Sequence, residues 1–318
     1  MTAAPLVTGA AGFAGRHLLR LLAAEGPVTG WHRPGEARPE IAQVRWQAVE
    51  LLDAKAVAHA LAAAAPSGIY HLAGVPHVAD SWARAEETFA GNVVATLNLL
   101  DAMRAQGRTC RVLITGSATI YQPAARALTE DDPLAPNTPY GASKLAQELA
   151  ALTAFREFGI PVVVSRSFNH IGPEQAPAFA AAAFARQLAR IEAGLMPPVL
   201  KVGNLEAERD LSDVRDTVRA YRALMASGRP GACYNVCAGR AISMQQLLDG
   251  LRAHIGVPVT VEQDPARMRP ADTPLVLGDP SRLHADTGWT PSIPLERTLA
   301  DIVAYWREQA GKESPEGA

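Results

Sequence analysis

Three glycines, each three residues after the last, lie between the first apolar run of the chain and the amphipathic stretch that follows it. The apolar run, 6–8, predicts a strand, and the stretch 12–24 predicts a helix. Glycines in a strand-to-helix turn allow a tight bend and bring the backbone close to a pyrophosphate at the helix N-terminus. The spacing G-x-x-G-x-x-G therefore predicts a dinucleotide site on a parallel α/β sheet. The residues of this turn are Gly9, Gly12, Phe13, Ala14 and Gly15.

Strand-like apolar runs alternate with helical stretches through the first half of the chain. The later predicted strands are 28–31, 44–49, 69–73, 111–115 and 161–165, and a long helix is predicted at about 86–104. This alternation predicts an α/β fold with a Rossmann-type, doubly wound parallel sheet. From Ser167 onward prolines are more frequent and the elements shorter, which predicts a smaller C-terminal α/β lobe that binds the substrate. We expect a dinucleotide-binding domain at 1–166 and the substrate lobe mainly at 167–318, with later segments crossing back.

Composition narrows the classes of protein. The chain has 318 residues and a net charge of −2, so it lacks the basic excess of a nucleic-acid surface. No basic and hydrophobic leader precedes the first strand, and no apolar run is long enough to cross a bilayer. We therefore expect a cytoplasmic protein without nucleic-acid or membrane partners. Cys110, Cys233 and Cys237 do not make a disulfide framework, and we predict no metal site.

Tyr140 and Lys144 lie four residues apart on a predicted helix, so they share one face. A positive charge at ~4 Å, with an effective dielectric of ~20, is worth about 4 kcal/mol, or roughly three pKa units. Such a charge would lower the pKa of the phenol until it exchanges protons at neutral pH. Ser117 follows a predicted strand 23 residues earlier and is placed to hold a substrate oxygen. The three residues predict carbonyl reduction or alcohol oxidation beside a nicotinamide.

The end of the second predicted strand bears on the choice of cofactor. An acid there binds the free 2′-hydroxyl of NAD, whereas an arginine suits a 2′-phosphate. This chain has Arg33 there, and the first acid after it is Glu36, which predicts NADP(H) over NAD(H). Glu50 and Leu51 close the third strand and are expected over the adenine. Leu72, Ala73 and Gly74 are expected beneath the pyrophosphate and the nicotinamide ribose.

Five further runs of the sequence resemble the extended short-chain dehydrogenases/reductases that act on nucleotide sugars. Within them the chain is most similar to the GDP-4-keto-6-deoxy-mannose reductases and their relatives, the GDP-mannose 4,6-dehydratases. The runs are SFNHIGP at 167–173, GNLEAERD at 203–210, YNVCAG at 234–239, QDPARMR at 263–269 and RLHADTGW at 282–289.

The resemblance implies several further roles. Asn92 would be an anchor beside the cofactor and the active site, and Lys144 would also bind the nicotinamide ribose. Asn169 would contact the sugar or phosphate of a GDP-sugar, and a homodimer would form through helices 86–104 and 140–158. Guanidinium groups suit a diphosphate clamp. The remaining substrate residues implied are Arg186 at the nucleotide, Leu200 and Lys201 near the base, and Arg209 and Arg269 at the diphosphate.

Two positions after Ser117 separate the possible reactions. Dehydratases of this family carry Glu where this chain has Thr119, and some carry Asp where it has Ala118. Those acids move protons during water elimination, which a hydroxyl and a methyl group do not. In the loop after Ser117, Gln122 replaces the glycine that is usual at this position in the family.

We therefore predict NADPH-dependent reduction of the C4 ketone of GDP-4-keto-6-deoxy-D-mannose to a GDP-6-deoxyhexose such as GDP-D-rhamnose. Ser117 and Thr119 would contact the substrate, Tyr140 would be the acid and Lys144 would tune it. Three alternatives stay open: a nucleotide-sugar 4-epimerase, a GDP-mannose 4,6-dehydratase and a non-catalytic NADP-sensing module. The stereochemistry at C4, and UDP or CDP in place of GDP, also stay open.

Overall fold

The computed structural model describes residues 3–76, 79–268 and 273–313. Its centre is a seven-stranded sheet in the order β10-β6-β5-β4-β1-β2-β3, and every neighbouring pair is parallel. The predicted Rossmann-type sheet is confirmed. The strands are β1 Leu6–Thr8, β2 Val28–His32, β3 Val44–Ala48, β4 Gly68–His71, β5 Arg111–Ser117, β6 Val162–Ser167 and β10 Cys233–Val236.

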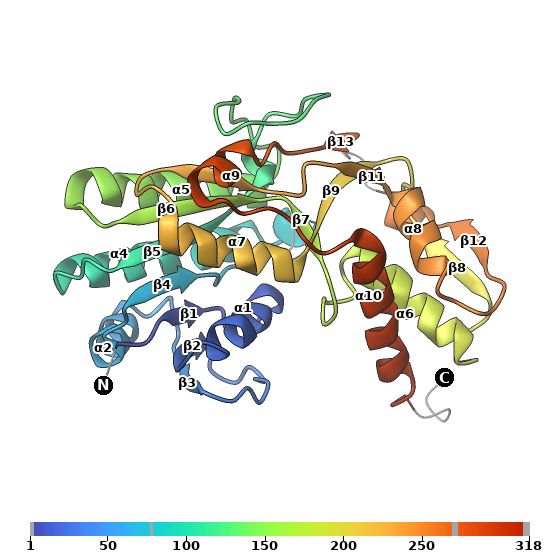
Figure 1. Cartoon of the computed structure of the whole chain (residues 1–318), viewed down its shortest axis with the longest axis horizontal. Helices are drawn as coiled ribbons and strands as arrows, with labels where there is room; N and C mark the ends of the chain where they lie inside the picture. The colour runs from blue at the N-terminus through green and yellow to red at the C-terminus, as the bar shows by residue number, and fades with distance from the viewer. Residues whose placement is uncertain (1–2, 77–78, 269–272, 314–318) are drawn as a thin grey trace.

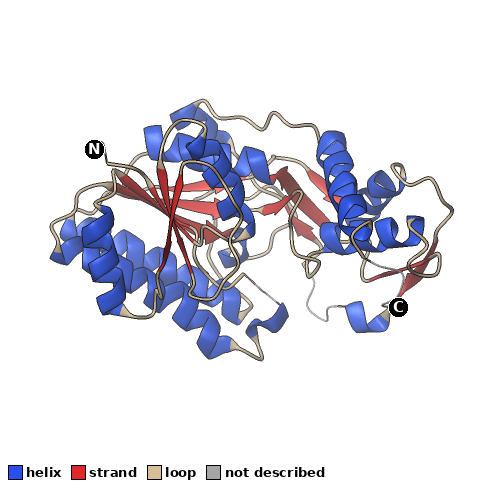
Figure 2. Cartoon of the chain, turned by 90° about the horizontal axis from the view of Figure 1, so that it is seen from below, coloured by secondary structure: helices blue, strands red, loops and turns tan. Residues whose placement is uncertain are grey.

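Helices cover both faces of this sheet, because alternate side chains of each strand point to opposite faces and both sets are apolar. Leu6 and Ile69 enter one apolar core, whereas Val7 and Tyr70 enter the other. Figure 2 shows the strands between the two helical layers. The helices of the first layer are α2 Ala54–Ala64, α4 Ala95–Ala105 and α5 Pro139–Phe158, and those of the second are α1 Phe13–Ala23, α7 Val214–Ser227 and α9 Ser281–Thr287.

The strand order reverses at β1, which has β2 on one side and β4 on the other. In open parallel sheets the loops at the carboxyl ends of the strands diverge at such a point and leave a crevice for a ligand. The fold therefore directs attention to the segments that follow β1, β4 and β5.

The long helix predicted at 86–104 is interrupted. It consists of α3 Ala85–Phe89, a π-helical segment η2 Ala90–Val94, and α4. π-segments within helices are frequently found at functional sites, and this one contains Asn92.

A second lobe lies beside the large sheet (Figure 1). Its apolar core joins α6 Ala180–Glu192, α8 Met244–Arg252 and α10 Leu295–Ala310. The segments α7, β10 and α9 follow residue 166 in sequence but belong to the layers of the large sheet. The strands outside that sheet are β7 Asn169–Ile171, β8 Val199–Val202, β9 Glu208–Asp213, β11 Ala241–Ser243, β12 Thr260–Gln263 and β13 Leu275–Val276. The short 3-10 turns are η1 Ala79–Ser81, η3 Ala118–Ile120 and η4 Pro265–Arg267.

Candidate active site

The glycine-rich turn after β1 packs directly against the end of β4. Gly9 has φ +65°, and a Cβ at this position would lie 2.7 Å from the Cα of Ala73. The carbonyl of Gly9 accepts a hydrogen bond of 3.0 Å from the N–H of Gly12, and a Cβ on Gly15 would overlap that same carbonyl oxygen. Only glycine allows both the backbone conformation and these approaches, so the turn and the segment after β4 form one surface.

The N-terminus of α1 is open to an anion. Gly12 is its N-cap and supplies no side-chain acceptor, and the first turn contains no acidic residue. The unpaired N–H groups and the positive end of the helix dipole suit a phosphate. Arg16 donates to the carbonyl of Ala11 within the turn (2.6 Å). Phe13 stacks on His170, with ring centroids 5.9 Å apart and planes 8° apart. A dinucleotide pyrophosphate fits this donor set.

The residues predicted at the adenosine end follow β2 and β3 at the same edge of the sheet. Arg33 comes directly after β2 and is exposed, and its N–H donates to the carboxylate of Glu36 (3.2 Å). Glu50 and Leu51 follow β3, and the carbonyl of Leu51 accepts from Asn98 (2.8 Å). The side chain of Arg33 is therefore accessible to a ligand at this edge.

Ser117 and Tyr140 meet at the carboxyl end of β5. Ser117 is the last residue of β5, and its Oγ lies 3.0 Å from Oγ1 of Thr119. Tyr140 lies in the first turn of α5, which Thr138 caps by accepting from the N–H of Gly141 (3.0 Å). Burial raises the pKa of the Tyr140 phenol, and a hydrogen bond with Ser117 opposes this. Two hydroxyls and a phenol thus share one place at the sheet edge.

Lys144 lies one turn further along α5 and is 5% exposed. Its Nζ donates to the carbonyl of Thr115 and to Oε1 of Gln147, at 2.7 Å each. Burial lowers the pKa of Lys144 to about 7. Within the described ranges no hydrogen bond joins Lys144 to Tyr140. The predicted lowering of the phenol pKa by this ammonium is wrong in direction, because burial of the phenolate outweighs the hydrogen bond with Ser117.

Asn92 joins the segment after β4 to α5. Its Oδ1 accepts from the N–H of Val75 (2.8 Å), and its Nδ2 donates to Oγ of Ser143 (2.9 Å). A Cβ on Gly74 would lie 2.6 Å from Oδ1 of Asn92. Leu72, Ala73 and Gly74 therefore run along the same edge as Lys144, held by a buried amide.

The predicted substrate residues lie on several elements of the second lobe. Asn169 is exposed on β7, and β7 pairs with β9 so that Asn169 lies opposite Leu211, two residues from Arg209. Nη1 of Arg209 donates to the carbonyl of Thr273 (2.8 Å). Arg186 on α6 is half-buried. The structure thus brings Asn169 and Arg209 onto neighbouring strands.

Two further substrate residues lie on β8. Lys201 is exposed, whereas the side chain of Leu200 is fully buried in the core of the second lobe. Any contact of Leu200 with a ligand would therefore involve its backbone. Arg269 lies outside the described residues.

Sequence reasoning missed a buried polar cluster behind Ser117. Arg166 on β6 forms an ion pair with Glu148 on α5 (2.6 Å) and donates to Oη of Tyr121 (2.9 Å). Tyr121 in turn donates to Oδ1 of Asn235 (2.6 Å). Glu148 follows Tyr140 by eight residues, so the spacing 140, 144, 148 on one helical face was a signal that could have found it.

Within the described part of the chain, no helix is long and apolar enough to cross a membrane, and no three His, Cys, Asp or Glu residues are grouped to hold a metal ion. The site is a glycine-rich anion-binding turn next to a Ser–Tyr–Lys set on a doubly wound sheet. These features define an extended short-chain dehydrogenase/reductase.

The chain belongs to the GDP-mannose 4,6 dehydratase family, whose model matches residues 6–302. GDP-6-deoxy-D-mannose reductase of Pseudomonas aeruginosa is 37% identical over 322 residues, covering 98% of this chain and 100% of that protein. The structure of RMD from Pseudomonas aeruginosa complexed with NADPH matches with a TM-score of 0.86 and 35% identity, over 97% of this chain and 100% of that one. UDP-glucose 4-epimerase of Thermus thermophilus, complexed with NAD, matches with a TM-score of 0.84 and 27% identity, over 95% and 98%.

Proposed function

We propose that the protein reduces the C4 ketone of GDP-4-keto-6-deoxy-D-mannose with NADPH and releases a GDP-6-deoxyhexose such as GDP-D-rhamnose. The proposal rests on the identity of the side chains around Ser117. Tyr140 and Lys144 complete a reductase set, whereas Thr119, whose Oγ1 lies 3.0 Å from Oγ of Ser117, offers a hydroxyl where elimination requires a carboxylate. The name of the 37% identical relative supports the same reaction.

The chemistry divides between the cofactor and the side chains. NADPH, when bound, supplies the hydride that C4 of the sugar gains. Tyr140 gives its phenolic proton to the C4 oxygen, so that the ketone becomes an alcohol and NADP⁺ remains. Burial raises the pKa of Tyr140, which keeps the phenol protonated at neutral pH and suits an acid. Ser117 holds the carbonyl oxygen, and Thr119 supports Ser117.

The cofactor would be held along the edge formed by β1 to β4. The open N-terminus of α1 would receive the pyrophosphate, and Arg33 would pair with the 2′-phosphate. Glu50 and Leu51 would cover the adenine, and Lys144 would bind the nicotinamide ribose. The similar structure of RMD from Pseudomonas aeruginosa, complexed with NADPH, supports NADPH over NADH as the cofactor.

The second lobe, mainly 167–318, would bind the GDP part of the substrate. Asn169 and Arg209 lie on neighbouring strands and would contact the sugar and the diphosphate, with Arg269 as a second clamp. Arg186 and Lys201 would reach the nucleotide from α6 and β8. Residues 1–166, together with α7, β10 and α9, would form the cofactor domain.

One pair of incubations tests the reaction. The purified protein with GDP-mannose and NADP⁺ should form no 4-keto product. Addition of a separate GDP-mannose 4,6-dehydratase and NADPH should yield a GDP-6-deoxyhexose, followed by NADPH absorbance and by mass spectrometry. Dehydration by this protein alone would overturn the proposal. Reduction of UDP- or CDP-linked sugars only would keep the chemistry and remove the substrate.

A 4-epimerase is the second candidate, favoured by the run Ser117-Ala118-Thr119 and by the fold shared with a UDP-glucose 4-epimerase. An epimerase reoxidises its own intermediate and retains its cofactor, whereas a reductase exchanges cofactor at every turnover. Denaturing the purified protein and measuring the nicotinamide released separates the two. A stoichiometric amount of cofactor favours the epimerase.

We also propose a homodimer that acts in the cytoplasm. Large apolar side chains are exposed along α4 and α5: Leu97 is 42%, Leu149 50% and Phe158 56% exposed. A dimer interface formed by these two helices of each protomer would bury these side chains. The cysteines of the described chain are free thiols, as a reducing compartment allows. Light scattering of wild type and Leu97→Glu tests the dimer, and cell fractionation tests the location.

A further inference from the structure

Gln147 is a buried amide beside the catalytic lysine. It follows Lys144 by three residues on α5 and is 0% exposed. Buried side-chain amides need partners for both ends. The Oε1 of Gln147 accepts from Nζ of Lys144 and its Nε2 donates to Oγ1 of Thr96, at 2.7 Å each. The side chain therefore joins the catalytic helix to α4.

The orientation of this amide is fixed by Thr96. A hydroxyl has one proton to donate and two lone pairs to accept with. Thr96 donates its proton to the carbonyl of Asn92 (2.7 Å), so it accepts from Gln147. A flipped amide would bring NH₂ against the ammonium of Lys144 and an oxygen against a hydroxyl that has no proton left to give. The oxygen of Gln147 therefore faces Lys144.

The same logic reaches back to β1. His71 lies on β4, fully buried, with Nε2 at 2.9 Å from Oγ1 of Thr96 and Nδ1 at 2.8 Å from Oγ1 of Thr8. Because the proton of Thr96 is already donated to Asn92, Thr96 can only accept from His71. The proton of His71 is therefore on Nε2, and Nδ1 accepts from Thr8. Burial, with the charge of Lys144, lowers the pKa of His71 to about 3, so the ring is neutral. One consistent set of hydrogen positions thus holds Gln147 in place.

We propose that Gln147 is a positioning residue of the reduction, whose Oε1 holds the charged Lys144 ammonium at the sheet edge, one helical turn from Tyr140. The carbonyl of Thr115 and Oε1 of Gln147 take two of its three N–H groups, which leaves one for Tyr140 or a cofactor hydroxyl. Within the described ranges no carboxylate is hydrogen-bonded to Lys144. Two neutral oxygens therefore stabilise a charge that burial disfavours. The catalytic meaning of this contact rests on the proposed reductase function.

The titratable groups that face Lys144 are few. His71 faces it from β4 and Tyr140 lies one turn before it on α5, while Tyr221 on α7 faces Tyr140. Glu148, the next acid on α5, is paired with Arg166. A substitution of Gln147 should therefore change mainly the pKa of Lys144.

Side-chain NMR of lysine tests the contact without any substrate. The sequence has four lysines, Lys55, Lys144, Lys201 and Lys312, so spectra of protein labelled with ¹³C-lysine are simple to assign. Gln147→Glu places a carboxylate beside Nζ and should raise the pKa of Lys144 by about one to three units. Gln147→Met keeps the length, removes the acceptor and should lower that pKa. Equal Lys144 pKa values in the wild type and both variants would overturn the proposal.

Kinetics connects the contact to turnover. The alkaline limb of the kcat profile should move up in Gln147→Glu and down in Gln147→Met, with kcat of the Met variant about ten- to a hundredfold lower at pH 8. Gln106→Met is the matched control, since the amide of Gln106 also donates a hydrogen bond to another helix (to the carbonyl of Ala58 on α2, 2.8 Å) but lies at the far end of α4. Should the Met variant not fold, the Glu variant alone decides. If the Lys144 pKa shifts as expected in the variants but the wild-type protein reduces no nucleotide 4-keto sugar, the reductase function is overturned and the contact stands.

Discussion

Tyr140 and Lys144 are one helical turn apart, and burial moves the pKa values of both toward the neutral form. The pKa of the phenol rises, and that of the ammonium falls to about 7. Both shifts have one physical cause, the loss of hydration of the charged form. The site therefore holds a protonated phenol beside a lysine whose charge depends on its hydrogen-bond acceptors, and single substitutions should separate the two roles.

Replacing Tyr140 by Phe should remove the proton donor and keep the packing of the ring. We expect turnover to fall by about 10²–10⁴-fold, the usual loss for a positioned acid, while NADPH affinity is retained. Stopped-flow reduction and fluorescence titration with NADPH measure the two effects. A Phe variant that keeps a tenth of wild-type turnover, with chemistry rate-limiting, would show that Tyr140 is not the acid.

Arg33 is the residue to change for cofactor preference. It is exposed directly after β2, so Arg33→Asp should remove the partner of a 2′-phosphate and supply one for a 2′-hydroxyl. The kcat/KM ratio of NADPH to NADH should exceed one in the wild type and fall or invert in the variant. Arg45→Asp, on the exposed side of β3, controls for a general change of charge. Equal kcat/KM for the two cofactors in the wild type would contradict this prediction.

At the scale of elements, α5 carries the candidate catalytic residues Tyr140 and Lys144, and a buried ion pair joins it to β6. Glu148 and Arg166 are 2% and 5% exposed and form a bidentate ion pair, with one contact of 2.6 Å and one of 3.0 Å. Because Arg166 also donates to Tyr121 and to the carbonyl of Glu130, the pair fixes the segment after Ser117 against α5. We therefore expect the alignment of Ser117 with Tyr140 to depend on this buried ion pair.

Glu148→Ala should leave the Arg166 charge buried without its partner. Breaking a buried ion pair in this way costs about 3–5 kcal/mol, measured as the free energy of unfolding in urea. Glu308→Ala, which removes an exposed ion pair with Lys312 on and after α10, should change stability by less than about 0.5 kcal/mol. Similar losses in the two variants would mean that the buried pair does not hold these elements together.

The sequence predicted the elements whose signal is local. Gly9, Gly12 and Gly15 mark a turn whose spacing carries its own geometry, and the strand and helix alternation gave the sheet. The π-segment around Asn92 was not predictable, because the pattern of apolar residues through 85–105 reads as one continuous helix. Its local signal is overridden by tertiary contacts, namely the hydrogen bonds of Asn92 to Val75 and Ser143. The network through Gln147 was missed for the same reason: Thr96 and His71 join it from distant parts of the chain.

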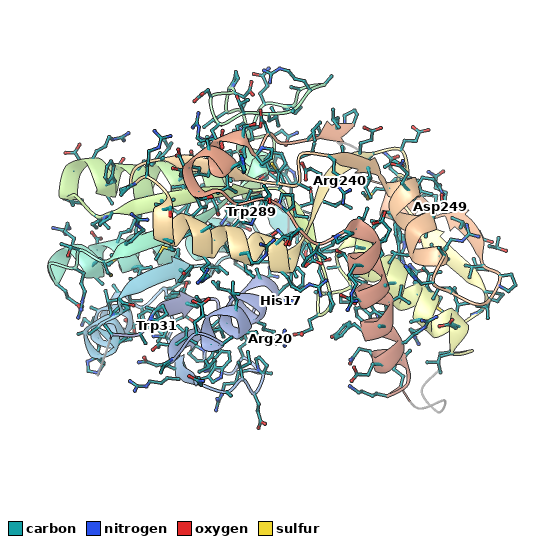
Figure 3. The ribbon with its side chains drawn as sticks, viewed as in Figure 1. His17, Arg20, Trp31, Arg240, Asp249 and Trp289 are labelled. Carbon is teal, nitrogen blue, oxygen red and sulfur yellow. The ribbon has the colours of Figure 1, made fainter. Side chains whose placement is uncertain are left out.

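At the scale of the whole molecule, α1, which begins at the glycine-rich turn, also contacts the loop that leads into the second lobe. Nε2 of His17 lies 3.1 Å from the carbonyl of Pro173, and Arg20 forms an ion pair with Glu174 (2.7 Å); Figure 3 shows His17 and Arg20 on α1. Glu174 has φ +71°, a left-handed conformation that costs a non-glycine residue of order 1 kcal/mol. The loop that follows β7 is therefore held in a strained turn by its contacts with α1.

Glu174→Ala should weaken this link between the proposed cofactor and substrate sites. We expect NADPH to tighten the binding of GDP in the wild type, and the variant to lose part of that gain. The ion pair is partly exposed, with side chains 42% and 20% accessible, so its worth is at most about 1 kcal/mol and the lost coupling at most about fivefold. Titration calorimetry of GDP with and without NADPH measures it. Glu25→Ala is the matched control, because Glu25, in the turn after α1, pairs with Arg222 on α7 (2.7 Å), away from the second lobe. Glu174→Gly should lose the same coupling while folding more stably than Glu174→Ala, since glycine adopts this turn without strain. A coupling equal in Glu174→Ala and Glu25→Ala would mean that the two lobes bind their ligands independently of this contact.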